Sequence, residues 1–348
     1  MKFVIFWRII KKVLKRCRKK IIVLIIFPGI LLIFLFSSCS KKNKKESMPL
    51  YQLGKNYNIP KFDADNAYKQ VEAQVKFGPR NPNSRGHAEC LAYLENQLKK
   101  YADTLVLQPF TYSGYNWITL HLTNLIAEFN PKSKNRIIFC AHWDTRPRAE
   151  YATNPADTNK PILGANDGGS GVGVLLELAR LLKQHKVSYG VEIVFFDGED
   201  YGRENDLNDF CLGSKYFAAN YNINKDPAFC VLLDMIGDKQ AVFFQEPNSV
   251  QFAPDIVNTI WNIAGQLNAA DFSNKQSEAI YDDHIPLNQA GLSTVDIIDA
   301  GLIGDKSPVK RRNYWHSEHD TMKNISKKTL QQVGDVLTYL IYSIHFNS

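Results

Sequence analysis

The segment VEIVFFDGED, Val191–Asp200, joins a short apolar run to a cluster of acidic residues. A continuous apolar run with several β-branched and aromatic residues is typical of a strand that is buried on both faces of a sheet. The acidic cluster follows at the carboxyl end of this strand, where ligands bind in open α/β sheets. The segment therefore predicts a buried strand and a functional site at the edge of the sheet where that strand ends.

Two further segments have the same design. RIIFCAHWD, Arg136–Asp144, and AFCVLLDMIG, Ala228–Gly237, each lead from an apolar stretch into histidine or acidic residues. A fourth apolar run, Thr294–Ile298, also predicts a buried strand. Because the carboxyl ends of parallel strands meet at one edge of a sheet, we expect the three polar clusters to converge on one crevice.

Helices are predicted around these strands from apolar residues that recur with helical spacing. The expected helices are Ala67–Phe77, Gly86–Tyr101, Gly171–Leu182 and the segment from Leu330 to Ile344. The alternating stretch Ile118–Leu122 predicts an antiparallel strand nearer the edge. Strands alternating with helices predict an α/β fold, with an open, mixed but mostly parallel sheet and helices on both faces. No change in composition divides residues 61–348, so we expect a single domain.

A glycine-rich segment, GANDGGSGV at Gly164–Val172, precedes the helix expected to begin near Gly171. It does not fit the dinucleotide-binding pattern, because Val174 occupies the position of the last glycine. It does not fit a nucleophile elbow around Ser170, because Val172 stands where the second glycine is needed. We interpret the segment as a tight loop that presents Asp167 as a metal ligand.

Two histidine-containing segments follow, YDDH at 281–284 and YWHSEHD at 314–320. His316 would add a nitrogen ligand to a site that is otherwise rich in carboxylates. Zinc favours such mixed ligands in a four-coordinate site, with one position open when the zinc is catalytic. His319 is an alternative nitrogen ligand.

The motifs HWD, GANDGGSGV, FFDGED, LLDMIG, DDHIP and YWHS, in this order, resemble those of the zinc-dependent glutaminyl cyclases. These enzymes are the animal-type glutaminyl-peptide cyclotransferases, which also occur in bacteria. They share a fold with the co-catalytic zinc aminopeptidases. The resemblance extends from about Phe62 to Ile344 and implies a zinc aminopeptidase-like fold.

The resemblance also implies a role for each site residue. One Zn²⁺ would be ligated by Asp167, Asp200 and His316, and Glu199 would be the general acid/base. The carboxylates of Asp234 and Asp283 would lie beside the reacting groups and could hydrogen-bond to each other. Trp315 and Trp143 would line the substrate pocket. The pair Glu199-Asp200 departs from the family, in which two glutamates usually stand here.

The expected reaction is the conversion of an N-terminal glutamine to pyroglutamate, with release of ammonia. An aminopeptidase is the alternative, because His142, Asp167 and Asp234 could hold a second zinc. A catalytically inactive binding module of the same fold is disfavoured, since Glu199 and every candidate ligand are present.

Charge is unevenly distributed along the 348 residues. The chain has 42 basic and 35 acidic residues and a formal charge of +7. Residues 1–38 contain nine of the basic residues and no acidic one, so residues 39–348 carry a formal charge of −2. The basic balance is therefore no sign of nucleic-acid binding, and no nucleic-acid partner is expected.

The N-terminal segment predicts export. A cationic stretch and the apolar run Ile21–Phe36 lead into small residues and Cys39, which resembles a bacterial lipobox. We therefore predict a lipoprotein signal at 1–38, a flexible tether at 39–60 and a catalytic domain at 61–348. An uncleaved signal anchor is the alternative. The protein would be a membrane-anchored monomer facing the periplasm, acting on N-terminal glutaminyl peptides or exported proteins.

Overall fold

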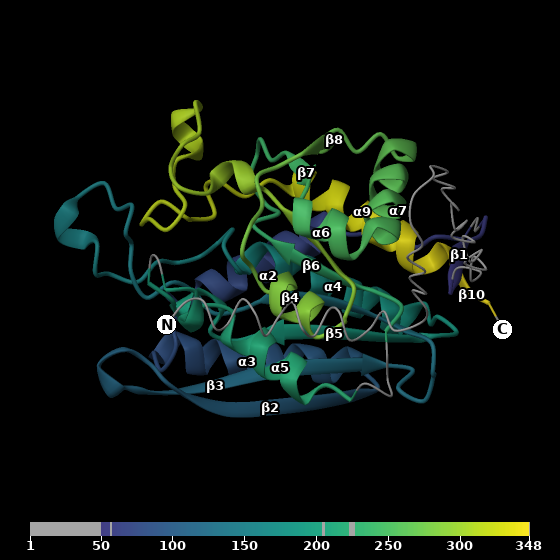
Figure 1. Cartoon of the computed structure of the whole chain (residues 1–348), viewed down its shortest axis with the longest axis horizontal. Coiled ribbons are helices and arrows are strands. Elements are labelled where there is room, and N and C mark those ends of the chain that lie inside the picture. Colours follow the sequence, from purple (N-terminus) through teal and green to yellow (C-terminus); the bar gives the residue numbers. More distant parts are fainter. Residues whose placement is uncertain (1–49, 56–57, 204–205, 223–226, 348) are drawn as a thin grey trace, which may run out of the picture. The chain divides into compact units, whose positions relative to one another are not determined.

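The computed structural model describes residues 50–55, 58–203, 206–222 and 227–347 (Figure 1). The predicted signal segment 1–38 and most of the predicted tether lie outside these residues. The part of the chain from Pro49 onward forms one compact unit. Within the described ranges, no helix is both long and apolar enough to cross a bilayer.

The centre of the fold is a six-stranded mixed sheet with the strand order β2-β3-β5-β4-β6-β9. Its parallel strands are β4 (Arg136–His142), β5 (Gly190–Phe196), β6 (Cys230–Asp234) and β9 (Thr294–Ile298). All four are buried along their whole length, as their apolar sequences predict. The antiparallel hairpin of β2 (Thr104–Ser113) and β3 (Thr119–Phe129) completes one edge. The predicted α/β fold class is confirmed.

Helices cover both faces of this sheet. The larger apolar core joins alternate side chains of the strands to one set of helices. This set comprises α2 (Ala64–Val75), α3 (Arg85–Tyr101), α4 (Gly169–Gln184), α7 (Pro254–Gln266) and α9 (Lys327–Ser343). A smaller core on the opposite face joins the other strand residues to α5 (Leu212–Asn220) and α8 (His284–Gln289). The four predicted helices are present, with starts two or three residues earlier in most cases because polar side chains such as those of Asp63 and Ser326 cap them.

Helix α4 sets the distance between the sheet and the glycine-rich loop before it. It packs so closely on β6 that a Cβ atom at Gly171 would lie 2.4 Å from the carbonyl oxygen of Leu233. At its start, Gly168 has a φ of 78°, a conformation that glycine adopts without strain. The loop before α4 therefore ends beside the carboxyl end of β6.

Two small sheets lie outside the central one. Strands β7 (Phe243–Gln245) and β8 (Phe272–Gln276) pair with each other near α6 (Pro247–Phe252). Strands β1 (Tyr51–Leu53) and β10 (Ile344–Phe346) pair antiparallel. The Tyr51 ring packs at 5.1 Å on Phe229, the residue that precedes β6. The β1–β10 pair therefore lies at the amino ends of the parallel strands, opposite the acidic clusters.

Candidate metal centre

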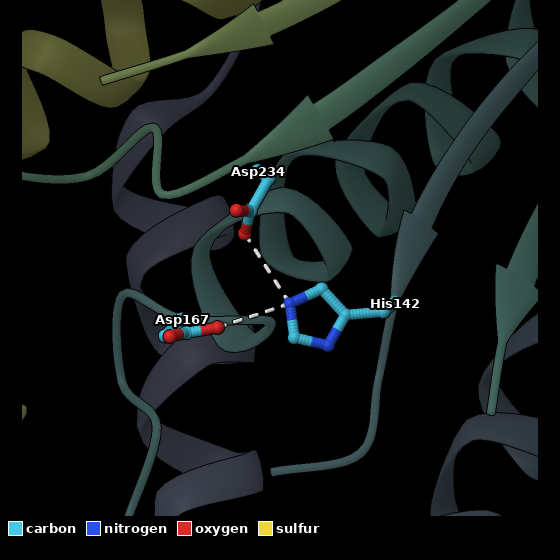
Figure 2. Close-up of side chains that lie close together, drawn as sticks. All are labelled: His142, Asp167 and Asp234. Atoms are coloured by element: carbon cyan, nitrogen blue, oxygen red, sulfur yellow. Dashed lines mark hydrogen bonds and ion pairs between the residues drawn. The ribbon is translucent and has the colours of Figure 1, made fainter. Parts of the chain in front are cut away.

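The predicted polar clusters meet at the carboxyl edge of the sheet. His142 ends β4 and Asp234 ends β6, while Asp167 comes from the loop before α4. Figure 2 shows these three side chains pointing toward one another. His142 Nε2 lies 3.1 Å from Asp167 Oδ1 and 3.2 Å from Asp234 Oδ1. We call this group the Asp234 triad.

A second group shares Asp167 with the first. His316 Nε2 lies 3.6 Å from Asp167 Oδ2 and 3.3 Å from Asp200 Oδ1, and we call these three residues the Asp200 triad. In each triad the ligand atoms lie within 4.8 Å of one another, and all the residues are buried. The two carboxylate oxygens of Asp167 thus face different triads.

The chemistry of both triads fits a zinc ion. Each combines one imidazole nitrogen with two carboxylates, a ligand set that zinc accepts readily. Among the described residues, Asp200 Oδ2 is buried and has no hydrogen-bond partner. A buried carboxylate oxygen without a partner is costly, and a bound cation would remove that cost.

Backbone hydrogen bonds fix the loop that carries Asp167. The carboxylate of Asp320 accepts from the amides of Asn166 and Asp167, at 2.9 and 3.0 Å. Asn166 Oδ1 in turn accepts from the amide of Gly237, beyond β6, at 2.7 Å. These bonds leave the Asp167 side chain free to point into both triads.

Asp144 fixes the turn that carries Glu199 and Asp200. Its two carboxylate oxygens accept from the amides of Glu199 and Asp200, at 3.1 and 3.3 Å. Its Oδ1 also lies 3.4 Å from Nδ1 of His142, on the side of the ring away from the triad. Asp144 therefore orients residues of both triads without being part of either.

Arg146 forms ion pairs with both Asp200 and Glu150. Its Nη1 donates to Asp200 Oδ1 at 2.8 Å, and its Nε and Nη2 bind both oxygens of Glu150 at 2.7 Å each. Burial alone would raise the pKa of Asp200, but His316 and Arg146 lower it well below the usual aspartate value. Asp200 is therefore ionised at neutral pH.

Glu199 stands beside the triads in a different environment. Its carboxylate lies within 4.8 Å of the thiol of Cys211 and of an oxygen of Asp282. Burial raises the pKa of Glu199 well above its usual value; His142 opposes this shift, while Asp200 and Asp282 add to it. A carboxyl group of this kind can carry a proton near neutral pH.

The position predicted for Asp283 is occupied by its neighbour. Asp282 is the residue beside Glu199, whereas Asp283 is fully buried and accepts a hydrogen bond from Ser214. Burial raises the pKa of Asp234 to about 8, and the charges of Asp167 and Asp282 contribute while His142 opposes the shift. The carboxylate partner of this site is therefore Asp282, which we had not singled out.

Comparison with known proteins identifies the family. Residues 124–341 match peptidase family M28. The chain belongs to this family. The predicted resemblance and the predicted aminopeptidase-like fold are thereby confirmed.

Three relatives show the range of activities in family M28. A solved structure of Bacteroides thetaiotaomicron glutaminyl cyclase is 39% identical, with a TM-score of 0.77 over 82% of this chain and 99% of that one. Glutaminyl-peptide cyclotransferase of Bothrops jararaca is 25% identical over 75% of this chain and 76% of its own length. Aminopeptidase YwaD of Bacillus subtilis is 25% identical over 84% of this chain, which spans only 59% of that relative.

His316 of the Asp200 triad also lines a small pocket of about 260 Å³. Trp315 lines this pocket and stacks on His316 with 3.5 Å between the ring centres. The other lining residues are the ion-paired Arg146 and Glu150 and the mostly apolar or aromatic Tyr151, Leu207, Phe210, Ala279, Ile280, Tyr281 and Ile303. A mostly apolar and aromatic pocket of this size accommodates an uncharged side chain.

Trp143 does not line this pocket, which corrects the prediction made for it. Its side chain is fully buried, stacks on His87 at 4.4 Å and donates from its indole N–H to the carbonyl of Thr123. Successive side chains at a strand end point to opposite faces, so Trp143 points away from the triads because His142 points toward them. His319, the alternative ligand, is exposed and lies beside Thr153 and Glu318.

A third buried group was missed by sequence reasoning. His284, at the start of α8, lies between Glu246 Oε2 at 3.2 Å and Asp296 Oδ2 at 3.4 Å. An aspartate inside the apolar strand TVDII was the available signal, because a buried charge requires a partner. This group lies behind Asp282 and ties α8 to β9.

Proposed function

We propose that the protein is a zinc-dependent glutaminyl-peptide cyclotransferase, which converts N-terminal glutamine to pyroglutamate and releases ammonia. The observation that carries this proposal is the buried pair of carboxyl groups, Glu199 and Asp282, beside the Asp200 triad and the small pocket. The solved cyclase at 39% identity supports the same reaction.

The reaction needs orientation and proton transfer more than a strong nucleophile. The α-amine of glutamine attacks its own side-chain amide carbon, a new C–N bond forms, and the original amide C–N bond breaks. Glu199 takes a proton from the attacking amine and gives one to the departing nitrogen, which leaves as ammonia. A pKa above that of an ordinary glutamate suits this double role, because Glu199 must both accept a proton and return one.

The other residues would hold the metal and the substrate. Asp167, Asp200 and His316 would ligate zinc, which supplies a Lewis acid for the amide carbonyl when bound. Asp234 and Asp282 would hydrogen-bond to the amine and the amide nitrogen, with Asp282 in the role first expected for Asp283. Trp315 would pack on the aliphatic part of the glutamine side chain.

An aminopeptidase is the second candidate, and one observation favours it. The Asp234 triad is as compact as the Asp200 triad, so the chain offers ligands for two metal ions that share Asp167. With two metals, Glu199 would instead activate water for hydrolysis of a peptide bond.

The mass of the product decides between the two reactions. A Gln-initiated peptide should lose one ammonia and keep every residue, while a Leu-initiated peptide should remain unchanged. Release of free amino acids from both peptides would establish the aminopeptidase and overturn the cyclase. Metal analysis of the same protein provides a second measurement, with one zinc per chain expected for the cyclase and two for the peptidase.

We also propose that the protein is exported and anchored by lipid at Cys39, so that exported proteins are among its substrates. The lipobox-like sequence supports this proposal. Cys39→Ser should move the enzyme from the membrane fraction to the soluble fraction of the cell envelope. An unchanged distribution would favour an uncleaved signal anchor.

A further inference from the structure

The tip of the β2–β3 hairpin exposes two large apolar side chains. It consists of the short 3₁₀ turn Tyr115–Trp117 and Ile118, closed by a 2.8 Å hydrogen bond from the amide of Gly114 to the carbonyl of Ile118. Trp117 is 92% exposed and Ile118 is 52% exposed. Exposed tryptophan is uncommon on soluble proteins, and exposed apolar patches often mark interaction sites.

The backbone at this tip is strained. Trp117 has a φ of 61°, in the left-handed region that bulky residues rarely adopt, at a cost of about 1 kcal/mol or more. Because the ring is almost fully exposed, packing within the described protein does not offset this cost. The conformation displays the ring to solvent, which is the geometry of a surface that contacts a partner.

The tip is held rigidly against the turn that carries the metal ligands. Tyr115 stacks on Tyr201 at 5.2 Å, and its amide donates to the Tyr201 hydroxyl at 2.9 Å. The amide of Arg203 donates to the Tyr115 hydroxyl, and its guanidinium lies 3.9 Å from the centre of the Tyr115 ring. Since Tyr201 directly follows Asp200, the position of Trp117 is tied to that of the metal centre.

A hydrogen bond links the hairpin to the turn that borders the pocket. Tyr112, near the end of β2, hydrogen-bonds to Asp209, which ends the short turn Leu207–Asp209. Leu207, at the start of that turn, lines the pocket and is still 53% exposed. Because Leu125 of the antiparallel β3 pairs with Phe195 near the end of β5, the hairpin tip extends past the catalytic edge (Figure 1).

We propose that Trp117 and Ile118, together with Leu207, form a docking surface for the polypeptide that follows the N-terminal glutamine of a substrate. This inference rests on the proposed cyclase function. The exposed side chain of Leu207 lines the pocket on the side of the hairpin, and an extended substrate chain that passes it advances about 3.3 Å per residue. A peptide of several residues that takes this path would contact the tip, where a rigid tryptophan provides a large apolar surface.

Peptides of different length test the docking surface. We would compare kcat/KM for a Gln-initiated dipeptide and a ten-residue peptide, using wild-type protein and Trp117→Ala. The variant should lose about fivefold to thirtyfold on the long peptide, through KM, and less than about twofold on the dipeptide. Phe252→Ala is the matched control: Phe252 is 42% exposed in α6, lines a groove with Leu50–Leu53 at the opposite end of the sheet, and should change neither value.

Equal losses on both peptides, or no loss on either, would overturn the docking surface. Binding to Glu199→Gln protein, measured by calorimetry, decides the same question without turnover. The ten-residue peptide should bind more tightly than the dipeptide, and Trp117→Ala should remove the difference. If Trp117→Ala abolished vesicle binding or self-association instead, with peptide binding unchanged, the surface would belong to a lipid or to a second copy. Failure of wild-type protein to cyclise either peptide would overturn the cyclase alone.

Discussion

The two triads that share Asp167 hold their other carboxylates in opposite electrostatic states. Asp200 has Arg146 at 2.8 Å, and its pKa lies well below the usual value despite burial. Asp234 is also buried but faces the acidic groups Asp167 and Asp282 besides His142, and its pKa rises to about 8. The Asp200 carboxyl group is thus ionised at neutral pH, whereas the Asp234 carboxyl group holds its proton more strongly.

This difference suggests how one fold serves two reactions. A site with a permanently ionised ligand binds its first metal without first losing a proton. A site whose carboxyl group is half-protonated near pH 8 is instead suited to hydrogen-bonding with an amine or an amide nitrogen. The comparison therefore favours zinc in the Asp200 triad and a substrate-binding role for Asp234.

Glu199 lies beside both triads, and its replacement should give the largest effect. Glu199→Gln should lower kcat by about 10²- to 10⁴-fold, because the amide cannot accept and return the proton. Zinc content should be unchanged, since Glu199 belongs to neither triad. Metal analysis and turnover of a Gln-initiated peptide measure the two effects, and undiminished turnover would show that another group is the base.

Replacing Asp200 and Asp234 by asparagine, one at a time, tests whether the two triads differ in zinc binding. Asp200→Asn should weaken zinc binding by about 100-fold or more, because it removes the ionised ligand of the first site. Asp234→Asn should keep one zinc per chain and lower turnover instead. Chelator competition measures the zinc affinity of each variant. Equal losses of zinc in both variants would mean that the two triads bind metal with the same strength.

Arg146 should control the pH at which zinc is released. Without its charge the pKa of Asp200 rises, so protons compete with zinc at higher pH, and the midpoint of acid release in Arg146→Met should move up by about one pH unit. Arg146→Lys should shift it less. Arg148→Met is the control, because Arg148 contacts Glu150 at 3.2 Å but hydrogen-bonds to the carbonyls of residues 201 and 202 rather than to Asp200. An unchanged midpoint in Arg146→Met would refute this role.

In metal-free protein, the Asp234 triad should have a smaller effect of opposite sign, in which stability is lost as pH rises rather than zinc as pH falls. A carboxyl group with a pKa of about 8 when folded and an ordinary value when unfolded holds more protons in the folded state between these values. Stability should therefore fall as pH rises from 6 to 8, by about 1 kcal/mol per pH unit. The pKa of His142 acts in the same direction: burial alone would lower it, but Asp144, Asp167 and Asp234 raise it well above the usual value.

Denaturant unfolding of chelator-treated protein measures this slope. Asp234→Asn should flatten it, because the variant lacks the carboxyl group whose titration gives the slope. A metal-free protein that becomes more stable between pH 6 and pH 8 would contradict the protonated state of this triad.

Much of this arrangement follows from the sequence for simple reasons. Apolar runs such as Val191–Phe196 can only be buried on both faces, and parallel burial brings their carboxyl ends together. That rule alone placed residues as distant in sequence as His142 and Asp234 in one crevice. The position of Asp167 followed from a glycine-rich loop that matched no phosphate-binding pattern.

The other features of the site depend on which way individual side chains point, and the sequence does not show this directly. Asp282 and Asp283 are neighbours of identical chemistry, and only the turn before α8 determines that Asp282 faces Glu199. Trp143 was within reach of sequence reasoning, because consecutive residues of a strand alternate faces. Arg146 gave no signal, since its role depends on a contact with Asp200 across 54 positions of the chain.

The pairing of β1 with β10 has a consequence for where the chain enters the catalytic domain. The described chain begins beside the amino ends of the parallel strands, where Tyr51 packs on Phe229, while the pocket opens at their carboxyl ends. The described chain therefore enters the catalytic domain at the end of the sheet opposite the pocket.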